Sequence, residues 1–435
     1  MTTKSNVAAG SPNAMFIQAA GLFAQSMQRN STLGRMSGPM PKGESSAAGV
    51  IRDPGRQQTS TDMPIVKTVD LSRGKGDEVE FHFLQPVGAY PIMGSRMAEG
   101  KGTGLSYDKS RVRVNQARFP VDLGDTMTGL RSAVDYRRVG RPVAQSLMDS
   151  YMDQSLLVHM AGARGYQDNI EWRVPVESHP DFAEMAVNPV LAPTKNRHYI
   201  ADAGNGISPF TVSGGEVALA TTDVLEMDTV DAIRTTMESI ALPPPAIKIP
   251  GDKVADDSPL RMLLVSPAQY HAFAADKDFR QFQASAIARA AKANNHPLFL
   301  GEVGLWNGIL IAKMPKPIRF YAGDTIRYCA SFTSDVESTC VVPAAFGTTH
   351  AIDRSILLGG QAVAQAFAAS GHGGMPFFWK EKTFDHDDKL ELLLGVIQGI
   401  SKVRWAVDQG DGSKHFTDHG VVAIDTAVKI IGARK

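Results

Sequence analysis

The chain has 435 residues, of which 43% are hydrophobic, so it is long enough to bury a substantial core and does not have a fibrous composition. Lysine plus arginine and aspartate plus glutamate number 45 each, and this zero formal net charge excludes a bulk electrostatic attraction to nucleic acid. Two cysteines, Cys329 and Cys340, exclude a disulfide framework or a four-cysteine zinc site, and no apolar run approaches the roughly 20 residues of a bilayer-spanning helix.

The first 66 residues have the composition of an arm without a core of its own. Residues 29–66 are rich in Ser, Gly, Pro, Thr and Gln and contain almost no large apolar side chains. Before them, apolar residues that include Phe16, Leu22 and Phe23 recur at helical spacing, which predicts a short amphipathic helix. We expect these three side chains to contact another subunit, because an arm of this composition needs external contacts to become ordered. The arm is mildly cationic, for which a solvated polar tail is the simplest interpretation.

Residues 74–121 contain two strand-like runs separated by a long loop. Apolar and polar residues alternate in 78–83 and in 111–115, so each run has one apolar face and one polar face. The roughly 25 residues between them far exceed an ordinary hairpin turn. An isolated ribbon is marginally stable in water, so we expect an adjacent subunit to cover its apolar face, which predicts an assembly protein. The candidate contact residues are Val79, Phe81, Val112 and Val114, with Lys101 near the tip of the loop.

A long helix and an irregular region follow the ribbon. Pro142 suits the first turn of a helix whose apolar residues follow one face until Gly162, which at 1.5 Å per residue is a rod of roughly 30–35 Å. Repeated prolines then break any long element within residues 166–220. A second helix is predicted over residues 230–240, and three consecutive prolines end it.

Alternating strand and helix signals in the next part of the chain indicate an α/β module. The predicted elements are a strand at 262–265, a helix capped by Ser266, a helix over 278–294, a tight Asn307-Gly308 turn between short strands, a helix from Asp353 to Phe367, and strands at 390–394 and 403–405. No period of 20 to 50 residues repeats, which excludes solenoids and propellers.

The chain carries no local motif of a catalytic or metal-binding site. The glycine-rich run around Lys101 is not followed by a helix whose amides could bind a phosphate. Asp385-His386-Asp387-Asp388 is the most ligand-like cluster, but a solvated turn explains it more simply, because successive residues of an extended chain point in different directions. Asp418-His419 has the same interpretation, and His159 on an apolar helix face fits a core histidine. We therefore expect no enzymatic activity, no metal and no cofactor.

Three stretches resemble one family of viral proteins. They are residues 113–121 (RVNQARFPV), 157–165 (LVHMAGARG) and 188–198 (NPVLAPTKNRH). These resemble the major capsid family of the enterobacterial phage N-four and its relatives. Residues 297–308 and 357–362 also resemble tailed-phage capsid subunits, so the similarity covers most of residues 70–407.

The resemblance implies an α+β protein with the HK97-like capsid fold. That fold has an N-terminal arm, an extended β-ribbon loop, a peripheral domain with a long spine helix, and an axial α/β domain. The corresponding segments would be 1–66 for the N-terminal arm, 67–125 for the extended loop region, 126–258 for the peripheral domain with the spine helix and the Pro-rich insertion, 259–332 for the axial domain, and 333–435 for the return to the peripheral domain and the C-terminal segment.

The function that the resemblance implies is structural. The chain would be a major capsid protein that self-assembles, as hexamers and pentamers, into the icosahedral shell around the double-stranded DNA genome of a tailed phage. It would be made in the bacterial cytoplasm and reside in the virion. Portal, scaffold and decoration proteins would be further partners, with weak nonspecific contact to packaged DNA and no membrane. Some capsids of this fold join subunits covalently through a loop lysine, for which Lys101 would be the candidate, although an exposed lysine is the simpler interpretation.

Two other functions remain open at this point. An encapsulin-type shell would have the same fold but would enclose a protein cargo. A cytosolic α/β hydrolase, with a site assembled from distant residues, is a remote alternative from a different class, and it leaves the long ribbon and the cationic arm unexplained.

Overall fold

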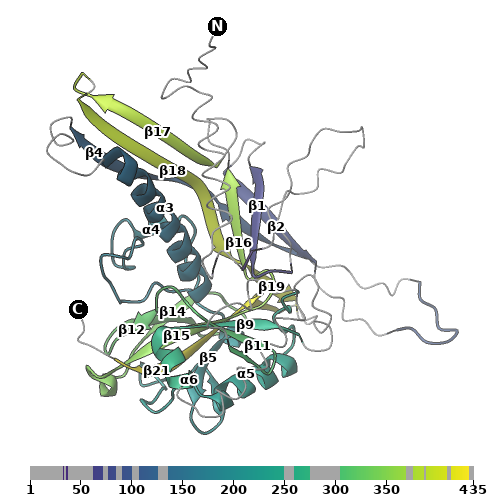
Figure 1. Ribbon diagram of the computed structural model, residues 1–435. Helices are drawn as coiled ribbons and strands as arrows, with labels where there is room; N and C mark the ends of the chain where they lie inside the picture. Colours follow the sequence, from purple (N-terminus) through teal and green to yellow (C-terminus); the bar gives the residue numbers. More distant parts are fainter. Residues whose placement is uncertain are drawn as a thin grey trace.

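The structure is a computed structural model that describes residues 33, 36–37, 62–71, 77–84, 91–99, 107–125, 136–248, 259–274, 304–368, 376–386, 388–408 and 413–430. The protein is α+β, with many strands and few helices, as the sequence analysis predicted. Figure 1 shows an elongated layer of long strands with one long helix beside it, a second body built on a mixed sheet, and a hairpin between them; residues 91–99 lie away from both bodies.

The elongated layer is built around β18 (Lys389–Lys402). β17 (Phe377–Phe384) and β4 (Asn115–Asp125) pair with the first part of β18 on its two edges, and β16 (Val363–Ala368) pairs with its last part. α3 (Tyr136–Ala161) lies along β4 and β18 (Figure 1). It is the long helix that the sequence predicted, and its buried face includes Ala144, Met148, Tyr151, Met152 and Leu156.

The long helix begins earlier than we expected. Pro142 was predicted in the first turn, but α3 begins at Tyr136, so the proline lies inside the helix and removes one helical hydrogen bond. Next to it, the Arg141 guanidinium donates to Glu381 of β17 (Nη2–Oε1 2.9 Å) and lies 4.9 Å from the centre of the Trp379 ring. Contacts with β17 thus stabilise a part of the helix whose start the local sequence did not indicate.

β1 (Ile65–Leu71) pairs parallel with β16 and extends the layer. A short part of the N-terminal arm is anchored here: Ser37 forms a β-bridge with Ile65, and Leu33 and Met36 are fully buried in the main core. These arm residues contact the body of their own subunit. The predicted arm contacts Phe16, Leu22 and Phe23 lie outside the described residues.

β2 (Glu78–Leu84) and β3 (Tyr107–Arg113) form the predicted ribbon, which we call the hairpin. Their register places Val79 opposite Val112 on one face and places glutamates opposite arginines on the other. Cross-strand ion pairs follow from this register, with Nε–Oε1 distances of 2.5 Å for Arg113–Glu78 and 2.9 Å for Arg111–Glu80. The alternation of apolar and polar residues that predicted the ribbon is therefore confirmed.

The second body contains an eight-stranded mixed sheet. Its strand order is β10 (Gly304–Trp306), β11 (Ile309–Lys313), β9 (Arg261–Val265), β15 (His350–Leu358), β21 (Val421–Lys429), β5 (His198–Asp202) and β6 (Gly206–Pro209), with β12 (Arg319–Phe320) paired to β15. α5 (Met227–Ser239) and α6 (Pro267–Ala274) pack on it through Val230, Ile233, Met237 and Phe273. The predicted helix at 230–240, the Ser266 cap and the Asn307-Gly308 turn are confirmed: the Ser266 hydroxyl accepts from the Gln269 amide (3.2 Å), and both turn residues have positive φ.

Smaller elements complete the described fold. They are α4 (Phe182–Ala186), the 3₁₀ turns η2 (Lys195–Arg197) and η4 (Ala344–Phe346), a sheet in the order β13 (Thr325–Cys329), β14 (Glu337–Val341), β8 (Glu216–Val217) and β7 (Val212–Ser213), and the pair β19 (Arg404–Asp408) and β20 (Lys414–Asp418).

The helix predicted from Asp353 to Phe367 is wrong. This segment forms β15 and β16, separated by a turn at residues 360–361. β15 is buried along nearly its whole length, and an apolar run that is buried on both faces has no period to distinguish a strand from a helix. Asp353 does not cap a helix but binds Arg319 (Nε–Oδ1 2.7 Å). The helix predicted at 278–294 lies outside the described residues.

The eight-stranded sheet collects strands from distant parts of the chain. It includes segments before, within and after the predicted axial segment 259–332, with β5 at 198–202 and β21 at 421–429 as its most distant members in sequence. The five-segment division of the chain stays a prediction.

Candidate functional site: the ionic junction beside the hairpin

The three stretches that carry the sequence resemblance meet where the hairpin, α3 and the eight-stranded sheet come together. Asn188 makes the link to the hairpin: its side-chain amide bonds both the N–H and the C=O of Arg113 (2.9 Å each) and donates to the Ile400 carbonyl (3.0 Å). Around this point lies a set of mostly buried charged groups that we call the ionic junction. Its members are Arg197, His198, Arg354, Lys402, Arg404, Asp418 and Asp425.

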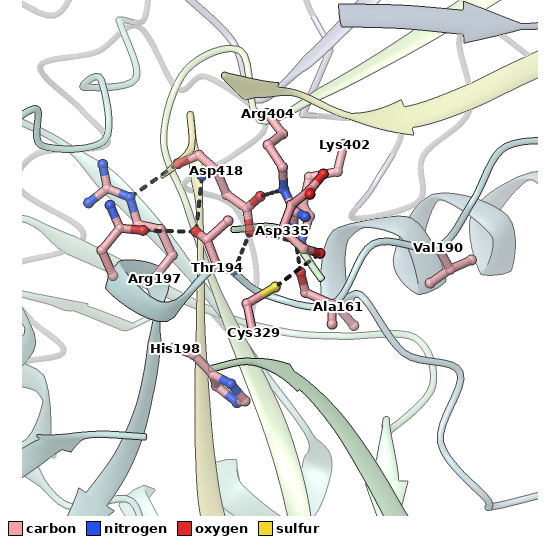
Figure 2. A network of polar contacts seen from close by, with 12 residues as sticks. Ala161, Val190, Thr194, Arg197, His198, Cys329, Asp335, Lys402, Arg404 and Asp418 are labelled. Carbon is pink, nitrogen blue, oxygen red and sulfur yellow. Dashed lines mark hydrogen bonds and ion pairs between the residues drawn. The ribbon is translucent and has the colours of Figure 1, made fainter. Parts of the chain in front are cut away.

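Asp418 is the centre of one half of the ionic junction (Figure 2). Its carboxylate lies 2.9 Å from Lys402 Nζ and 2.8 Å from Arg404 Nε, and it accepts the Thr194 amide at 3.2 Å. The backbone carbonyl of Asp418 accepts from Arg197 Nε at 3.1 Å. The carboxylate and the backbone of Asp418 thus link four segments to one another: β20, the end of β18, β19 and residues 194–198.

Burial and charge act against each other at Asp418. Burial alone would raise the pKa of this carboxyl, but the charges of Arg404 and Lys402 outweigh it and hold the pKa below its ordinary value. Burial lowers the pKa of Lys402 to about 8, although Asp418 opposes that shift. All three side chains are removed from water, so the loss of Asp418 would leave two buried cations without a counter-charge.

Asp425 is the centre of the other half. Arg354 binds it through two parallel bonds (Nε–Oδ1 2.7 Å, Nη2–Oδ2 2.8 Å), and His198 Nε2 lies 2.8 Å from Oδ2. His198 also stacks on Phe210, with ring centres 3.8 Å apart. Burial lowers the pKa of His198 to about 4, so the ring is neutral at pH 7 and its Nε2–H donates to the carboxylate.

Arg354 also fixes the end of the long helix. Its Nη1 donates to the carbonyl of Ala161, the last residue of α3, at 3.2 Å. The chain then turns at Gly162 (φ 66°), and Arg164 lies 3.6 Å from the Trp172 ring centre and donates to the Val174 carbonyl (2.7 Å). A basic side chain at a helix C-terminus also complements the helix dipole. The ionic junction therefore couples α3 to the eight-stranded sheet.

The hairpin is attached to the same region by an apolar cluster. Val79 and Val112 are buried, and together with Phe81 and Val114 they pack against residues of β16, β19 and the segment between β18 and β19. The covering residues are Ala364, Ala366, Val403, Trp405 and Val407. Asp108 of β3 adds a polar contact, because its Oδ2 accepts the Ala406 amide at 2.5 Å.

This packing corrects one premise of the sequence analysis. We expected the apolar face of the ribbon, with Val79, Phe81, Val112 and Val114, to lack cover within its own chain, but the chain's own strands cover it. Sequence reasoning treated the ribbon as isolated because its covering residues lie almost 300 positions further along the chain. Lys101 lies outside the described residues.

In the described part of the hairpin, exposed large apolar side chains lie instead within residues 91–99, which we call the hairpin tip. All nine of these residues are exposed, including Ile92 (38%), Met93 (69%) and Met97 (67%). Large apolar side chains gathered on a projecting loop usually mark a contact with another molecule. The sequence analysis placed no contact at these three residues.

A groove of about 330 Å³ lies beside the hairpin, and we call it the side groove. It is lined by β3, by residues 188–191, by Asp335 of the β13–β14 loop, by Ser401 at the end of β18, and by the β19–β20 pair. The carbonyl of Phe332, in the same β13–β14 loop, accepts the amide of Phe416 in the groove wall (2.9 Å), which places Phe332 at the rim. Phe332 (43%) and Val336 (72%), both on the β13–β14 loop, are exposed.

The other residues considered for chemistry occupy structural positions. His159 is buried, and its Nε2 lies 3.1 Å from the Ala186 carbonyl, which confirms a core histidine. Asp385 and His386 form a turn with positive φ, and no group of three or more metal-ligating side chains occurs in the described part of the chain. None of the described helices is long and apolar enough to cross a membrane.

The junction residues themselves were not predicted. Asp418 was treated as part of a solvated turn, although it is fully buried. Two features of the sequence could have pointed to the junction. Thr194 and His198 lie inside a stretch that carries the family resemblance, and the Lys402–Arg404 segment is basic. Spacing along the chain could not reveal that these groups meet, because more than 200 residues separate Thr194 from Asp418.

Comparisons with known proteins agree on one family. A sequence model of the family described as phage capsid protein matches residues 6–430. No curated protein matches the chain.

Several solved structures have the same fold. The capsid of Ralstonia phage GP4 is 22% identical, with a TM-score of 0.66 over 90% of this chain and 96% of that chain. The capsid of cyanophage Pam1 is 14% identical, with a TM-score of 0.56 over 89% of this chain and 96% of that chain. The capsid of the Helicobacter pylori bacteriophage KHP30 is 12% identical, with a TM-score of 0.53 over 89% of this chain and 94% of that chain. The fold is therefore the HK97-like capsid fold.

Proposed function

Because the chain belongs to the family of phage capsid proteins, we propose that its copies contact one another through the hairpin tip when they build a shell. The protein is a structural major capsid protein of a tailed phage, and it resides in the virion as part of the shell into which it self-assembles. The proposal concerns the residues that carry the contact. The narrower resemblance to the phage N-four group stays a prediction.

The exposure of Ile92, Met93 and Met97 is the observation that supports this contact. In the free subunit these side chains face water, and burying one large apolar side chain contributes on the order of 1.5–3 kcal/mol. Methionine adapts its shape to irregular surfaces, which suits a contact that must form between subunits in slightly different environments. Each contact is modest, and the symmetry of a closed shell repeats it many times.

The ionic junction has a supporting role in this proposal. Together with Asn188, it fixes the root of the hairpin, the end of α3 and the eight-stranded sheet relative to one another, through Asp418 and Arg354. A projecting loop reaches a neighbour at a defined place only if its root is rigid. The function of the junction is therefore geometric, and no step of chemistry is assigned to it.

The experiment that tests the proposal replaces Met93 and Met97 together by aspartate. Two charges in an apolar contact carry a large desolvation cost, so we expect folded subunits that no longer form shells under electron microscopy. Ser95→Asp is the matched control, because it adds a charge to the same exposed segment without removing an apolar side chain. Shells of normal yield from the double variant would contradict the proposal.

We also propose that the assembled rings are hexamers and pentamers, and that portal, scaffold or decoration proteins bind faces other than the hairpin tip. Formal neutrality of the chain supports only weak, nonspecific contact with packaged DNA. The encapsulin-type alternative has no observation in its favour.

A further inference from the structure

At one end of the eight-stranded sheet, the described part of the chain buries two arginines that bind no carboxylate. We propose that Arg197 and Arg261 form a binding site for a small inorganic oxyanion such as phosphate. The inference concerns the single subunit and does not depend on how copies of the chain contact one another.

Both arginines lie where strands of the sheet begin. Arg197 directly precedes β5, and Arg261 is the first residue of β9. β9 and β21 are each antiparallel to β15, and β5 is parallel to β21, so β5 and β9 begin at the same end of the sheet. Burial lowers the pKa of Arg197 to about 10, and the charge of Arg261 acts in the same direction. The two guanidinium groups are therefore close enough to interact.

Within the described residues, each guanidinium bonds only backbone carbonyls. Arg197 is 1% exposed and donates to the carbonyls of Asp418 (Nε–O 3.1 Å, Figure 2) and Leu242. Arg261 is 4% exposed and donates to the Pro244 carbonyl through Nε (3.1 Å) and Nη2 (3.0 Å). The Nη1 group of each arginine is buried and has no hydrogen-bond partner there. An unpaired N–H on a buried charged group is costly, so both groups are suited to bind an anion.

Two carboxylates act on this pair through their charge, but each is bound elsewhere. Asp418 acts on Arg197, yet both of its side-chain oxygens bind the cations of β18 and β19. Glu238 acts on Arg261, yet it is bound to Arg234 (Nε–Oε1 2.6 Å) and is itself exposed. Positive charge is therefore in excess at this end of the sheet. A phosphate ion has several acceptor oxygens and can bind two guanidinium groups at once.

The carbonyls that occupy the two arginines belong to residues 241–244, which we call the strap. Leu242 has a φ of 54°, a backbone conformation that is uncommon for a residue other than glycine and that recurs at ligand clamps. Residues 241–243 are exposed, whereas backbone hydrogen bonds at Ile240 (3.1 Å) and Pro245 (2.9 Å) fix the chain on either side. The strap can therefore move without disturbing the sheet, and phosphate oxygens would take the place of its carbonyls.

The first test is isothermal titration of unassembled subunits with inorganic phosphate at constant ionic strength. We expect saturable binding of one phosphate per subunit, with a dissociation constant on the order of 1 mM or lower. Arg261→Gln removes one of the two charges and should weaken binding by about tenfold or more. Arg111→Gln is the matched control, because it removes an arginine charge from the exposed face of the hairpin and should leave binding unchanged.

Two results of this titration would overturn the inference. Equal affinity of the wild-type chain and Arg261→Gln would mean that the arginine pair does not bind phosphate. Equal weakening by Arg261→Gln and Arg111→Gln would mean that phosphate is attracted loosely to surface charge.

The second test uses the wild-type chain, so it does not depend on how well a variant folds. Binding to the folded subunit raises the urea midpoint steeply at low phosphate and more slowly once the site is occupied, whereas general exclusion of phosphate from the protein surface acts in proportion to concentration. At constant ionic strength, most of the rise should therefore occur below about 10 mM phosphate. A midpoint that rises only in proportion to phosphate, or does not rise, would indicate that water fills the site and would overturn the inference.

Discussion

The ionic junction and the hairpin tip differ in how they accommodate unfavourable groups: the junction buries charged side chains, whereas the tip exposes apolar side chains to water. The junction contains seven charged or titratable side chains, and each has a bonded partner within the same chain. The hairpin tip exposes three large apolar side chains and an arginine without a described partner. The groups of the ionic junction find their partners when the subunit folds, whereas those of the hairpin tip are suited to contact another molecule.

This difference indicates how one chain can serve both as a stable subunit and as a building block. Charged groups that satisfy one another inside the subunit fix the angles between hairpin, helix and sheet. Apolar groups left at the end of a long projection contribute only when copies meet. Changes in the junction should therefore act on the unassembled subunit, whereas changes in the tip should act on assembly.

The largest expected effect on subunit stability comes from Asp418→Asn. The substitution keeps the shape of the side chain but leaves Lys402 and Arg404 buried without a counter-charge, which should cost about 3–5 kcal/mol of unfolding free energy. Urea unfolding of unassembled subunits measures it. Asp385→Asn is the control, because Asp385 pairs with Lys389 at an exposed site, where ion pairs contribute at most about 1 kcal/mol. Equal effects of the two substitutions would contradict the assignment of the junction.

The next effect is a loss of stability in mild acid. Burial lowers the pKa of His159, His198 and His419 to about 4 in the folded chain, whereas the unfolded value is about 6.5. Between these values the unfolded chain takes up protons and the folded chain does not, so stability is full above about pH 6.5, decreases as the pH falls, and stops decreasing from this cause below about pH 4. For a fully buried histidine the loss is at most about 3 kcal/mol.

Unfolding free energies measured from pH 7 to pH 4.5 test this expectation. Asp418 and Asp425 have lowered pKa values in the folded chain, and their contribution to the slope begins only below about pH 5, so the slope above about pH 5 reports on the histidines. His159→Gln keeps a donor for the Ala186 carbonyl but cannot titrate, and it should reduce the slope. A pH-independent unfolding free energy over this range would exclude the histidines as the cause.

Much of the fold was predictable because several elements follow from residues that are close together in sequence. The alternation in 78–83 and 111–115 gave the hairpin, and the apolar face of α3 gave the long helix. The Asn307-Gly308 pair gave a turn, because it fits a conformation with positive φ. In each case the residues that define the element are neighbours in sequence.

The parts that could not be predicted depend on long-range contacts. β15 was taken for a helix because burial on both faces removes the period that local analysis reads. Asp418 was taken for a solvated residue because its partners at 194, 402 and 404 come together only in the folded chain. For the same reason the cover of Val79 and Val112 was assigned to a neighbouring subunit when the chain supplies it from β16 and β19.

The smallest expected effect on subunit stability belongs to the hairpin tip and gives the sharpest contrast with the core. Met97→Ala should change the unfolding free energy of unassembled subunits by less than about 0.5 kcal/mol, because the side chain already faces water. Met148→Ala is the matched substitution in the core on α3, where the methionine is fully buried and its truncation should cost about 2–5 kcal/mol. For subunits that remain folded, the relative size of the two effects should reverse in assembly. Met97→Ala should raise the protein concentration needed to form shells, as followed by light scattering. A Met148→Ala subunit held below its unfolding temperature should assemble normally. A Met97→Ala variant that is as unstable as Met148→Ala would mean that the tip is packed within the subunit and is not available to a neighbour.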